Sequence, residues 1–300
     1  MPTSRSVIVV LNAAAGSARG TSDIEGQIVD LFRAVAVDAE VVTLRAGQNP
    51  TDTAREASEH ADVVVAAGGD GTVSGVAAGL VGGRAALGVI PLGTLNHFAK
   101  DLGVPFDLAE AVGVVAAGHL VRVDVGTVND RIFVNNSSIG IYPDIVQERD
   151  ALQRGGRRKW PAFAIATARV LRRHDGVTVT IEVNGRVHRW RTPFVFVGNN
   201  EYEIDGRQVG GRTSLHSGKL FVYLAPRARV HDLPLLMVNA LLGRAGESPA
   251  FEIVATTELT LRTAPDEPIR VAMDGEVETL TTPLQFHIRA GALPVVVPLR

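Results

Sequence analysis

Short apolar runs alternate with helical spacing through the first 120 or so residues, and this alternation restricts the fold more than any other feature of the chain. The β-branched runs are residues 7–11, 40–44, 62–67 and 87–90, and segments such as 22–36 and 53–60 between them have helical spacing. Alternation of this kind is typical of βαβ units, in which helices cover both faces of a parallel sheet. We therefore predict an α/β domain with a parallel sheet. Thr53 and Glu56 have the spacing of a capping box, which predicts a helix start after Asn49-Pro50.

The hydrophobic period changes from about residue 120. Apolar residues at 121, 123 and 125 alternate with charged ones, and residues 177–183 alternate in the same way, which is typical of half-buried antiparallel strands. We expect helices only at about 144–173 and near 230–242. The pattern predicts a domain boundary near residue 125, with the α/β domain at 1–125 and a mainly antiparallel, β-sandwich-like domain at 126–300. The last strand is a candidate to return to the first domain.

The composition narrows the class of protein. The 300 residues are enough for two domains, and 46% hydrophobic with 21% charged residues is ordinary globular composition. A formal net charge of -2 gives no indication of nucleic-acid binding. The absence of cysteine excludes disulfides, thiolate metal sites and a cysteine nucleophile, and is compatible with a reducing cytoplasm. We expect no signal peptide, and no apolar run approaches the roughly 18 residues of a membrane span.

The strongest local motif is a glycine-rich turn. Gly68-Gly69-Asp70-Gly71-Thr72 follows the apolar run 62–67 and opens a helical stretch to Leu80. Glycines let backbone N–H groups approach an anion, and a helix start adds a favourable dipole. The motif therefore predicts a phosphate-binding turn, in which Asp70 binds either Mg²⁺ on a nucleotide or the N–H groups of the turn. The alternative is a strand-to-helix turn whose glycines serve only positive φ angles.

Three further polar turn elements follow the neighbouring strands. Residues 91–96, Pro-Leu-Gly-Thr-Leu-Asn, come after the run 87–90, residues 12–17 follow the first run, and Thr43 ends the second. The carboxyl ends of parallel strands lie at one edge of a sheet, where open α/β sheets bind ligands. We therefore expect these turns to face one another around a ligand. The chain has no G-x-x-x-x-G-K-[S/T] motif, and its glycines miss G-x-G-x-x-G by one residue.

These motifs resemble a known enzyme family. GGDGT after a strand, followed about twenty residues later by PLGTLNHFAKDLGVP, resembles the catalytic domain shared by diacylglycerol kinases, sphingosine kinases and related bacterial lipid kinases. Asp124-Val-Gly, Asn136-Ser-Ser-Ile-Gly140, Val197-Gly-Asn-Asn200 and Asp274-Gly-Glu276 follow in the expected order. The resemblance covers nearly the whole chain. It implies an ATP-binding domain and a lipid-acceptor domain with ATP and Mg²⁺ in a cleft that they share, and transfer of the γ-phosphoryl group to a hydroxyl of diacylglycerol or a related lipid.

The resemblance also implies site residues. The nucleotide-contacting set is Asn12, Thr43, Gly68, Gly69, Asp70, Gly71, Thr72, Thr94 and Asn96, with Asp70 also serving the metal. The D-G-E motif supplies the general base, which falls on Asp274 or Glu276, and the choice between them stays open. A hairpin turn is the structural alternative for this motif, and both interpretations can hold together. Bacterial members commonly carry an Asp, where this chain has Ser217, that helps to hold a structural Mg²⁺; because serine is a poorer ligand, we expect no such accessory metal.

The segment from Arg154 to Arg173 combines basic residues with an apolar helical stretch that contains Trp160. Such a segment can rest on an anionic membrane, or it can be a surface helix with solvated charges. We expect a cytoplasmic enzyme that touches the inner face of the membrane transiently, while the lipid and the oligomeric state stay open. Two other functions compete. A NAD kinase also uses GGDGT, but the run Gly93–Lys100 favours the lipid branch; a non-catalytic nucleotide-binding regulator would not need both carboxylates of D-G-E.

Overall fold

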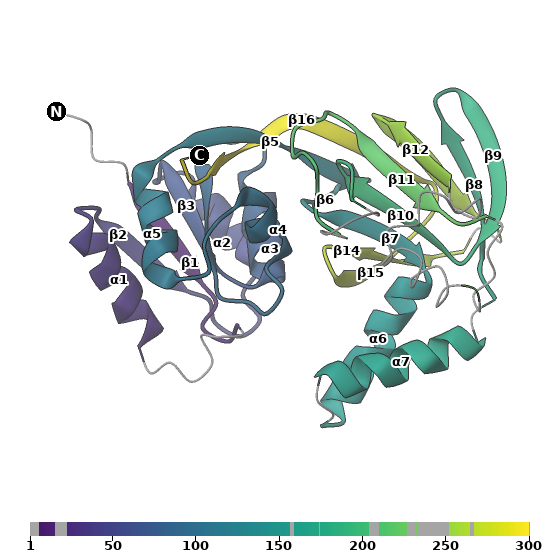
Figure 1. Cartoon of the computed structure of the whole chain (residues 1–300), viewed down its shortest axis with the longest axis horizontal. Coiled ribbons are helices and arrows are strands. Elements are labelled where there is room, and N and C mark those ends of the chain that lie inside the picture. The colour runs from purple at the N-terminus through teal and green to yellow at the C-terminus, as the bar shows by residue number, and fades with distance from the viewer. Residues whose placement is uncertain are drawn as a thin grey trace. The chain divides into compact units, whose positions relative to one another are not determined.

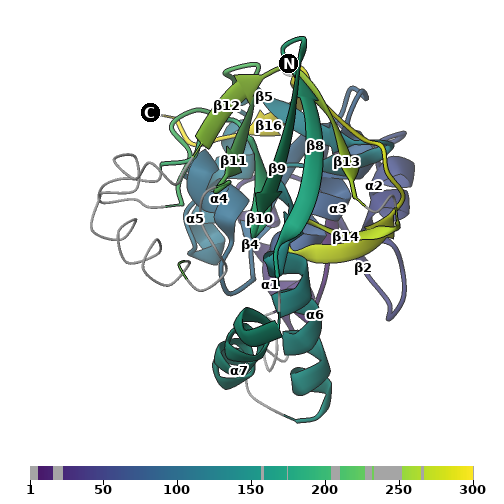
Figure 2. The same ribbon diagram turned by 90° about the vertical axis from the view of Figure 1, so that its right-hand side faces the viewer.

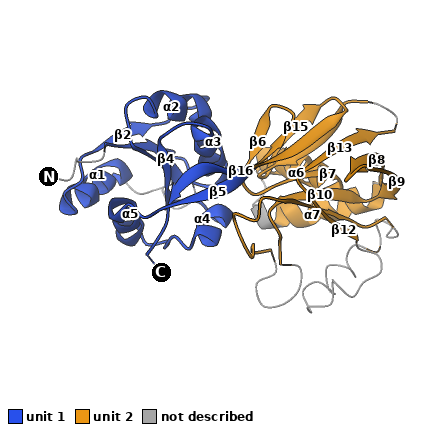
Figure 3. Ribbon diagram, turned by 90° about the horizontal axis from the view of Figure 1, so that it is seen from above, with its two compact units in different colours: residues 1–125, 290–300 blue, residues 126–289 orange. Residues whose placement is uncertain are grey.

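A computed structural model describes residues 6–15, 23–156, 159–173, 175–203, 210–226, 232, 252–264 and 267–299. The chain divides into two compact units (Figure 3): unit 1 is Met1–Val125 with Ala290–Arg300, and unit 2 is Gly126–Arg289. The predicted helix at 230–242 lies, apart from residue 232, outside the described residues.

Unit 1 alternates strands and helices (Figure 1). Its elements are β1 (Val7–Leu11), α1 (Ile24–Ala34), β2 (Ala39–Thr43), α2 (Pro50–Ala57), β3 (Val63–Gly68), α3 (Asp70–Leu80), β4 (Ala86–Pro91), α4 (His97–Leu102) and α5 (Leu108–Ala117). The strands are parallel in the order β2-β1-β3-β4, which confirms the predicted sheet. Every residue of β1, β3 and β4 is buried, which explains their uninterrupted apolar runs.

The register places the predicted turns at one edge of this sheet. Leu11 pairs with Thr43 on one side and with Ala67 on the other, and Gly68 pairs with Pro91. The carboxyl ends of four neighbouring strands are therefore level, as the sequence predicts. The last strand, β16 (Leu284–Val296), pairs in parallel with β4 through Val295 and Leu87.

The predicted start of α2 is wrong by one turn. The helix begins at Pro50, and its N-cap is Asn49, whose side chain accepts the N–H of Thr51 at 2.9 Å. Thr53 lies inside the helix and its hydroxyl donates to the Asn49 carbonyl at 3.1 Å, so it forms no capping box with Glu56. Asparagine is a stronger cap than threonine, and proline fits the first helical position, so Asn49-Pro50 sets the boundary.

Unit 2 consists mainly of antiparallel strands. Its elements include β6 (Arg131–Phe133), β7 (Asn136–Gly140), β8 (Val177–Val183), β9 (Arg186–Thr192), β10 (Phe194–Asn199), β11 (Leu220–Leu224), β12 (Glu252–Thr256), β13 (Glu258–Thr263), β14 (Ile269–Met273) and β15 (Glu276–Leu280). One sheet has the order β12-β11-β10-β7-β14-β15, and β16, β13, β8 and β9 pair in a second one. The strand β5 (Leu120–Val128) pairs with β6.

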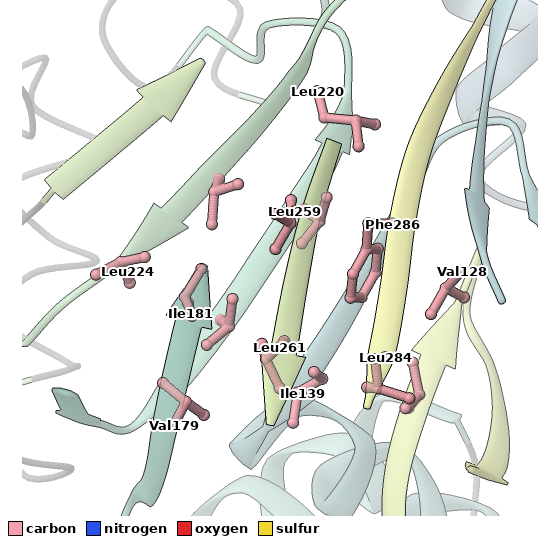
Figure 4. Close-up of a cluster of buried hydrophobic side chains, with 14 of the residues drawn as sticks. Val128, Ile139, Val179, Ile181, Leu220, Leu224, Leu259, Leu261, Leu284 and Phe286 are labelled. Atoms are coloured by element: carbon pink, nitrogen blue, oxygen red, sulfur yellow. The ribbon is translucent and has the colours of Figure 1, made fainter. Parts of the chain in front are cut away.

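Apolar side chains from both sheets of unit 2 form one core (Figure 4). Ile139 and Leu220 from the first sheet and Val179, Leu261 and Phe286 from the second are all buried in the same cluster. The β-sandwich-like architecture predicted from the period-two alternation is thus confirmed.

Two helices extend from the first sheet of unit 2 (Figure 2). They are α6 (Ile141–Arg154) and α7 (Lys159–Arg173), so the predicted segment 144–173 is two helices that are separated after Arg154. Ala166 and Val170 of α7 pack on Ile141 and Ile145 of α6. Among the described residues, none of the helices has both the length and the apolar character needed to span a bilayer.

Candidate functional site

Asp70 joins the two glycine-bearing turns of unit 1. One oxygen of its carboxylate accepts the backbone N–H of Asn96 at 2.9 Å, and the other accepts the N–H of His97 at 2.6 Å. Asp70 is the first residue of α3, whereas Asn96 and His97 begin α4. The sequence analysis leaves Asp70 to bind either Mg²⁺ or the N–H groups of its own turn; the N–H groups that it binds in the fold belong instead to the second turn and the start of α4.

The N-terminus of α3 is free to bind an anion. Its N-cap, Gly69, has no side chain to cap it, and the N–H groups of Asp70, Gly71 and Thr72 have no acceptor among the described residues. The first N–H groups of a helix point outward along its axis and carry the positive end of the helix dipole. A phosphate group is the ligand that such a helix end binds most readily.

The two turns touch through their glycines. A Cβ added to Gly93 would lie 2.5 Å from the Cα of Gly69 and 2.5 Å from the Oδ1 of Asn96. Asn96 folds back over the turn: its Oδ1 accepts the Gly93 N–H at 3.0 Å and its amide donates to the Gly93 carbonyl at 2.9 Å. The Asn96 side chain is buried and therefore maintains the shape of the turn, while Thr94 is exposed. The turns face each other, as the sequence predicts.

The remaining predicted nucleotide residues lie beside this pair of turns. Asn12 follows β1, and its amide donates to the hydroxyl of Thr72 at 3.1 Å while its Oδ1 accepts the Ala14 N–H at 3.1 Å. Part of the predicted turn at 12–17 lies outside the described residues. Thr43 ends β2, and its hydroxyl donates to Glu25, a residue that the sequence motifs do not single out.

In unit 2, Asp274 is fixed by backbone N–H groups. Its carboxylate accepts the N–H of Val134 at 2.9 Å, of Asn135 at 2.8 Å and of Asn136 at 3.1 Å. Asp274 and Gly275 both have positive φ and form the two-residue turn between β14 and β15, so the hairpin interpretation of D-G-E is confirmed.

The opposite side of the same backbone segment binds Arg212. Its guanidinium donates to the Val134 carbonyl at 2.6 Å, to the Asn199 carbonyl at 3.2 Å and to the Oδ1 of Asn135 at 3.0 Å. Residues 134–136 are thus held between a carboxylate and a guanidinium. No sequence motif points to Arg212, because its partners are two backbone carbonyls and the Asn135 side chain, which only the fold brings to it.

Glu276 differs from Asp274 although only Gly275 separates them. Its carboxylate has no hydrogen-bond or ion-pair partner among the described residues, and the residue is exposed. Loss of part of its water shell to the surrounding protein raises the pKa of Glu276, and the negative charges of Asp274 and Glu278 raise it further. A carboxylate that is accessible, unpaired and more basic than usual is suited to accept a proton.

Ser217 is bound to a buried asparagine. Its hydroxyl and its backbone N–H both donate to the Oδ1 of Asn200, at 2.6 Å and 2.7 Å. The V-G-N-N motif therefore holds the loop around residue 217 by direct hydrogen bonds. The described residues contain no group of three or more His, Asp or Glu side chains that could hold a metal ion.

The charges of the Arg154 to Arg173 segment are partly neutralised within unit 2. Glu148 of α6 binds Arg169 at 2.8 Å and Arg173 at 2.7 Å, and these two arginines lower the pKa of the Glu148 carboxyl. No ion-pair partner for Arg154 or Arg172 lies in the described part of the chain. The side chains of residues 157–160, including Trp160, are outside the described set.

Comparison with known proteins agrees with this arrangement of motifs. The diacylglycerol kinase catalytic domain matches residues 6–128, and the YegS C-terminal NAD kinase beta sandwich-like domain matches residues 144–297. The chain belongs to the diacylglycerol kinase family. The match to this catalytic domain supports a lipid kinase enzyme.

Relatives in this family align over most of their length. A diacylglycerol kinase of Staphylococcus saprophyticus is 25% identical over 270 residues, 89% of this chain and 88% of the relative. One of Staphylococcus aureus (strain bovine RF122 / ET3-1) is 24% identical over 89% of this chain and 85% of its own. The crystal structure of a putative diacylglycerol kinase from Bacillus anthracis str. Sterne is 25% identical in sequence. It aligns over 98% of this chain and 95% of its own length, with a TM-score of 0.79. The likeness extends across both units.

Proposed function

We propose that this member of the family is an ATP- and Mg²⁺-dependent kinase that phosphorylates the hydroxyl group of diacylglycerol or a closely related lipid. The observation that carries the proposal is the uncapped N-terminus of α3, beside a second turn that Asp70 holds against it. The names of the staphylococcal relatives support the lipid acceptor.

Unit 1 supplies the nucleotide part of the proposed site. The N–H groups of Asp70, Gly71 and Thr72 bind phosphate oxygens, and Asn12 and Thr94 lie on the same edge of the sheet. Mg²⁺ fits as an ion that arrives with the nucleotide, since it keeps several waters and uses one or two carboxylates besides phosphate. Asp70 suits this role because a carboxylate has about four acceptor positions and two of them bind N–H groups. When bound, the ion neutralises charge on the phosphate oxygens.

Unit 2 supplies the proposed base. Glu276 accepts the proton of the lipid hydroxyl as that oxygen attacks the γ-phosphorus, because its carboxylate is free and its pKa is raised by desolvation and by Asp274 and Glu278. Asp274 is a positioning residue, since three backbone N–H groups occupy it. Within D-G-E we therefore propose Glu276, rather than Asp274, as the base.

The helices α6 and α7 support a weak membrane contact. Arg154 and Arg172 are exposed and unpaired among the described residues, whereas Glu148 neutralises Arg169 and Arg173. A surface with so few free cations attaches reversibly to anionic lipid, since each contributes about 1 kcal/mol near a membrane. We therefore propose a cytoplasmic enzyme that visits the membrane to collect its lipid.

Product analysis tests the proposal. The pure protein is incubated with γ-labelled ATP, Mg²⁺ and either vesicles containing diacylglycerol or soluble NAD, and the label is followed by extraction and mass spectrometry. Label in an organic-soluble phospholipid supports the proposal. Label in a water-soluble dinucleotide would make the protein a NAD kinase, and nucleotide binding without transfer would make it a regulator.

A further inference from the structure

An ion pair connects the two sheets of unit 2 beside the D-G-E turn. The Nε of Arg131, the first residue of β6, donates to the Oε2 of Glu278 on β15 at 3.0 Å. The strand β6 pairs with β5 in one sheet, whereas β15 is the last strand of the other. Only two residues separate Glu278 from Glu276, the proposed base, so the pair brings a positive charge close to that carboxylate.

Arg131 and both glutamates of β15 are on the core-facing sides of their sheets. Residues directly opposite each other on neighbouring strands share a face of the sheet, because side chains alternate along each strand. The residues opposite Arg131, Glu276 and Glu278 are all buried in the core cluster, and they are Val128, Met273 and Val271. The three charged residues are themselves exposed, so they lie at the rim of this core.

Glu276 therefore has charges of both signs near it. Desolvation raises the pKa of Glu276 most, followed by the negative charges of Asp274 and Glu278. Residues two apart on a strand are about 7 Å apart, so the guanidinium beside Glu278 lies roughly 7–10 Å from Glu276. A positive charge at this position opposes the two acids, because it stabilises the ionised form of a carboxyl.

We propose that Arg131 is a positioning residue for catalysis, which favours the ionised form of Glu276 by offsetting the charge of Glu278. Arg131 acts through the base rather than on the substrate. The side chains of the ion pair are 57% and 44% exposed, and pairs so exposed contribute little to folding. The main effect of Arg131 is therefore on ionisation. This inference rests on the proposed function, since it takes Glu276 as the base.

Arg131→Met is the decisive substitution, because it removes the charge and keeps most of the side-chain length. The ionisation of Glu276 is followed by carbon-13 NMR of its carboxyl group, and the pH dependence of kcat/KM is measured with ATP, Mg²⁺ and diacylglycerol vesicles. Because a unit charge about 8 Å away through water shifts an ionisation by roughly 0.4 pH unit, we expect both midpoints to rise by that amount. Below the midpoint, kcat/KM should fall by about twofold to threefold.

Three further proteins separate the charge from other effects of the substitution. Arg131→Lys keeps the charge and should restore the wild-type midpoints. The double variant Arg131→Met/Glu278→Gln removes both charges of the pair and should return the midpoints close to those of the wild-type chain. Arg33→Met is the matched control, since it breaks an exposed ion pair with Asp30 on α1 and should move neither midpoint.

The two measurements distinguish this inference from the proposed function. An unchanged NMR midpoint of Glu276 in Arg131→Met would overturn the inference and leave the kinase proposal intact. A raised NMR midpoint without a matching change in the kcat/KM profile would refute Glu276 as the base, and the inference with it. A shift that persists in about 1 M salt, where the Debye length is about 3 Å, would also overturn the inference, because an effect of charge is screened there.

Discussion

The carboxylate of Asp70, the first residue of α3, accepts the backbone N–H of Asn96, the residue that precedes α4, at 2.9 Å. The N-terminus of α4 is therefore already occupied by an anion that belongs to the protein, and that of α3 is not. The two helix starts are neighbours with different roles: one closes the turn, and the other remains available for a phosphate. The Asp70 carboxylate thus occupies the start of α4 and leaves the start of α3 for the phosphate of the proposed nucleotide.

Asp70→Asn should reduce both stability and activity. An amide can accept only one of the two N–H bonds and places its own N–H₂ group against the other donor. We expect a loss of about 1–3 kcal/mol in the free energy of unfolding, the usual cost of an unsatisfied partner of a charged group, together with loss of kinase turnover. Urea denaturation and the lipid kinase assay measure the two effects separately.

Asp52→Asn is the matched control for this substitution. Asp52 pairs with Arg55 on the surface of α2, with both side chains more than 60% exposed, so its loss should change stability by less than about 0.5 kcal/mol. If Asp70→Asn were as stable and as active as the wild-type chain, both the structural and the catalytic role of Asp70 would be refuted.

Gly93→Ala should separate the two turns. Its Cβ would overlap the backbone of Gly69 and the side chain of Asn96, and neither can move without breaking the turn. We expect nucleotide affinity to fall by about tenfold or more and the protein to lose about 1–3 kcal/mol of stability, as for other overpacked sites. Calorimetry with ADP and thermal unfolding test this expectation.

Gly113→Ala gives the opposite expectation for the same chemical change. Gly113 lies in α5 with no atom within 4 Å of an added Cβ, so alanine should stabilise the helix by about 0.5–1 kcal/mol without affecting nucleotide binding. Equal loss of nucleotide affinity in Gly113→Ala and Gly93→Ala would show that contact between the turns is not the cause.

The sequence predicts the sheet edge well because local signals determine it. Each apolar run of β1, β3 and β4 lies within a few residues of the polar turn that follows it. Because βαβ units make the strands parallel, these turns must lie at the same edge of the sheet. The start of α2 is missed because Asn49 competes with Thr53 as a cap, and the sequence contains both signals.

The parts that the sequence does not predict depend on contacts between distant residues. Asp274 and Glu276 are equivalent carboxylates in the D-G-E motif, and only the fold brings the backbone of residues 134–136 to one of them. Arg212 and Glu25 have no motif at all, since a long-range hydrogen bond leaves no pattern in a single sequence. Side-chain roles within a known motif are therefore the information that the structure adds.

Glu276→Gln should lower activity without lowering stability, whereas Asp274→Asn should lower stability. Glu276 has no partner to lose among the described residues, so its amide should retain the fold and lose about 10²–10⁴ in kcat, the usual contribution of a general base. Asp274→Asn loses acceptors for three N–H groups and should cost about 2–4 kcal/mol of stability. Steady-state kinetics and urea denaturation of both variants make the comparison; full activity in Glu276→Gln would exclude it as the base.

The pH profile of kcat/KM should report the raised pKa of Glu276. A general base works only when deprotonated, so activity falls as pH drops through its pKa, and that acidic limb should lie above the ordinary glutamate value of about 4.3. Desolvation, Asp274 and Glu278 raise this pKa in that order. Glu278→Gln removes one like charge and should move the acidic limb to lower pH.

The raised pKa of Glu276 should lower folding stability at neutral pH, although it serves catalysis. Because the folded-state pKa of Glu276 is raised, its ionised form opposes folding at pH values above that pKa, and the effect disappears as pH falls below the unfolded value. Glu276→Gln should therefore be at least as stable as the wild-type chain at pH 7, although its kcat should be much lower. Glu258→Gln is the control: it removes a surface carboxylate beside His287 and should leave the pH dependence of kcat/KM unchanged. If the acidic limb of the kcat/KM profile stays at the same pH in Glu278→Gln, another group takes the proton.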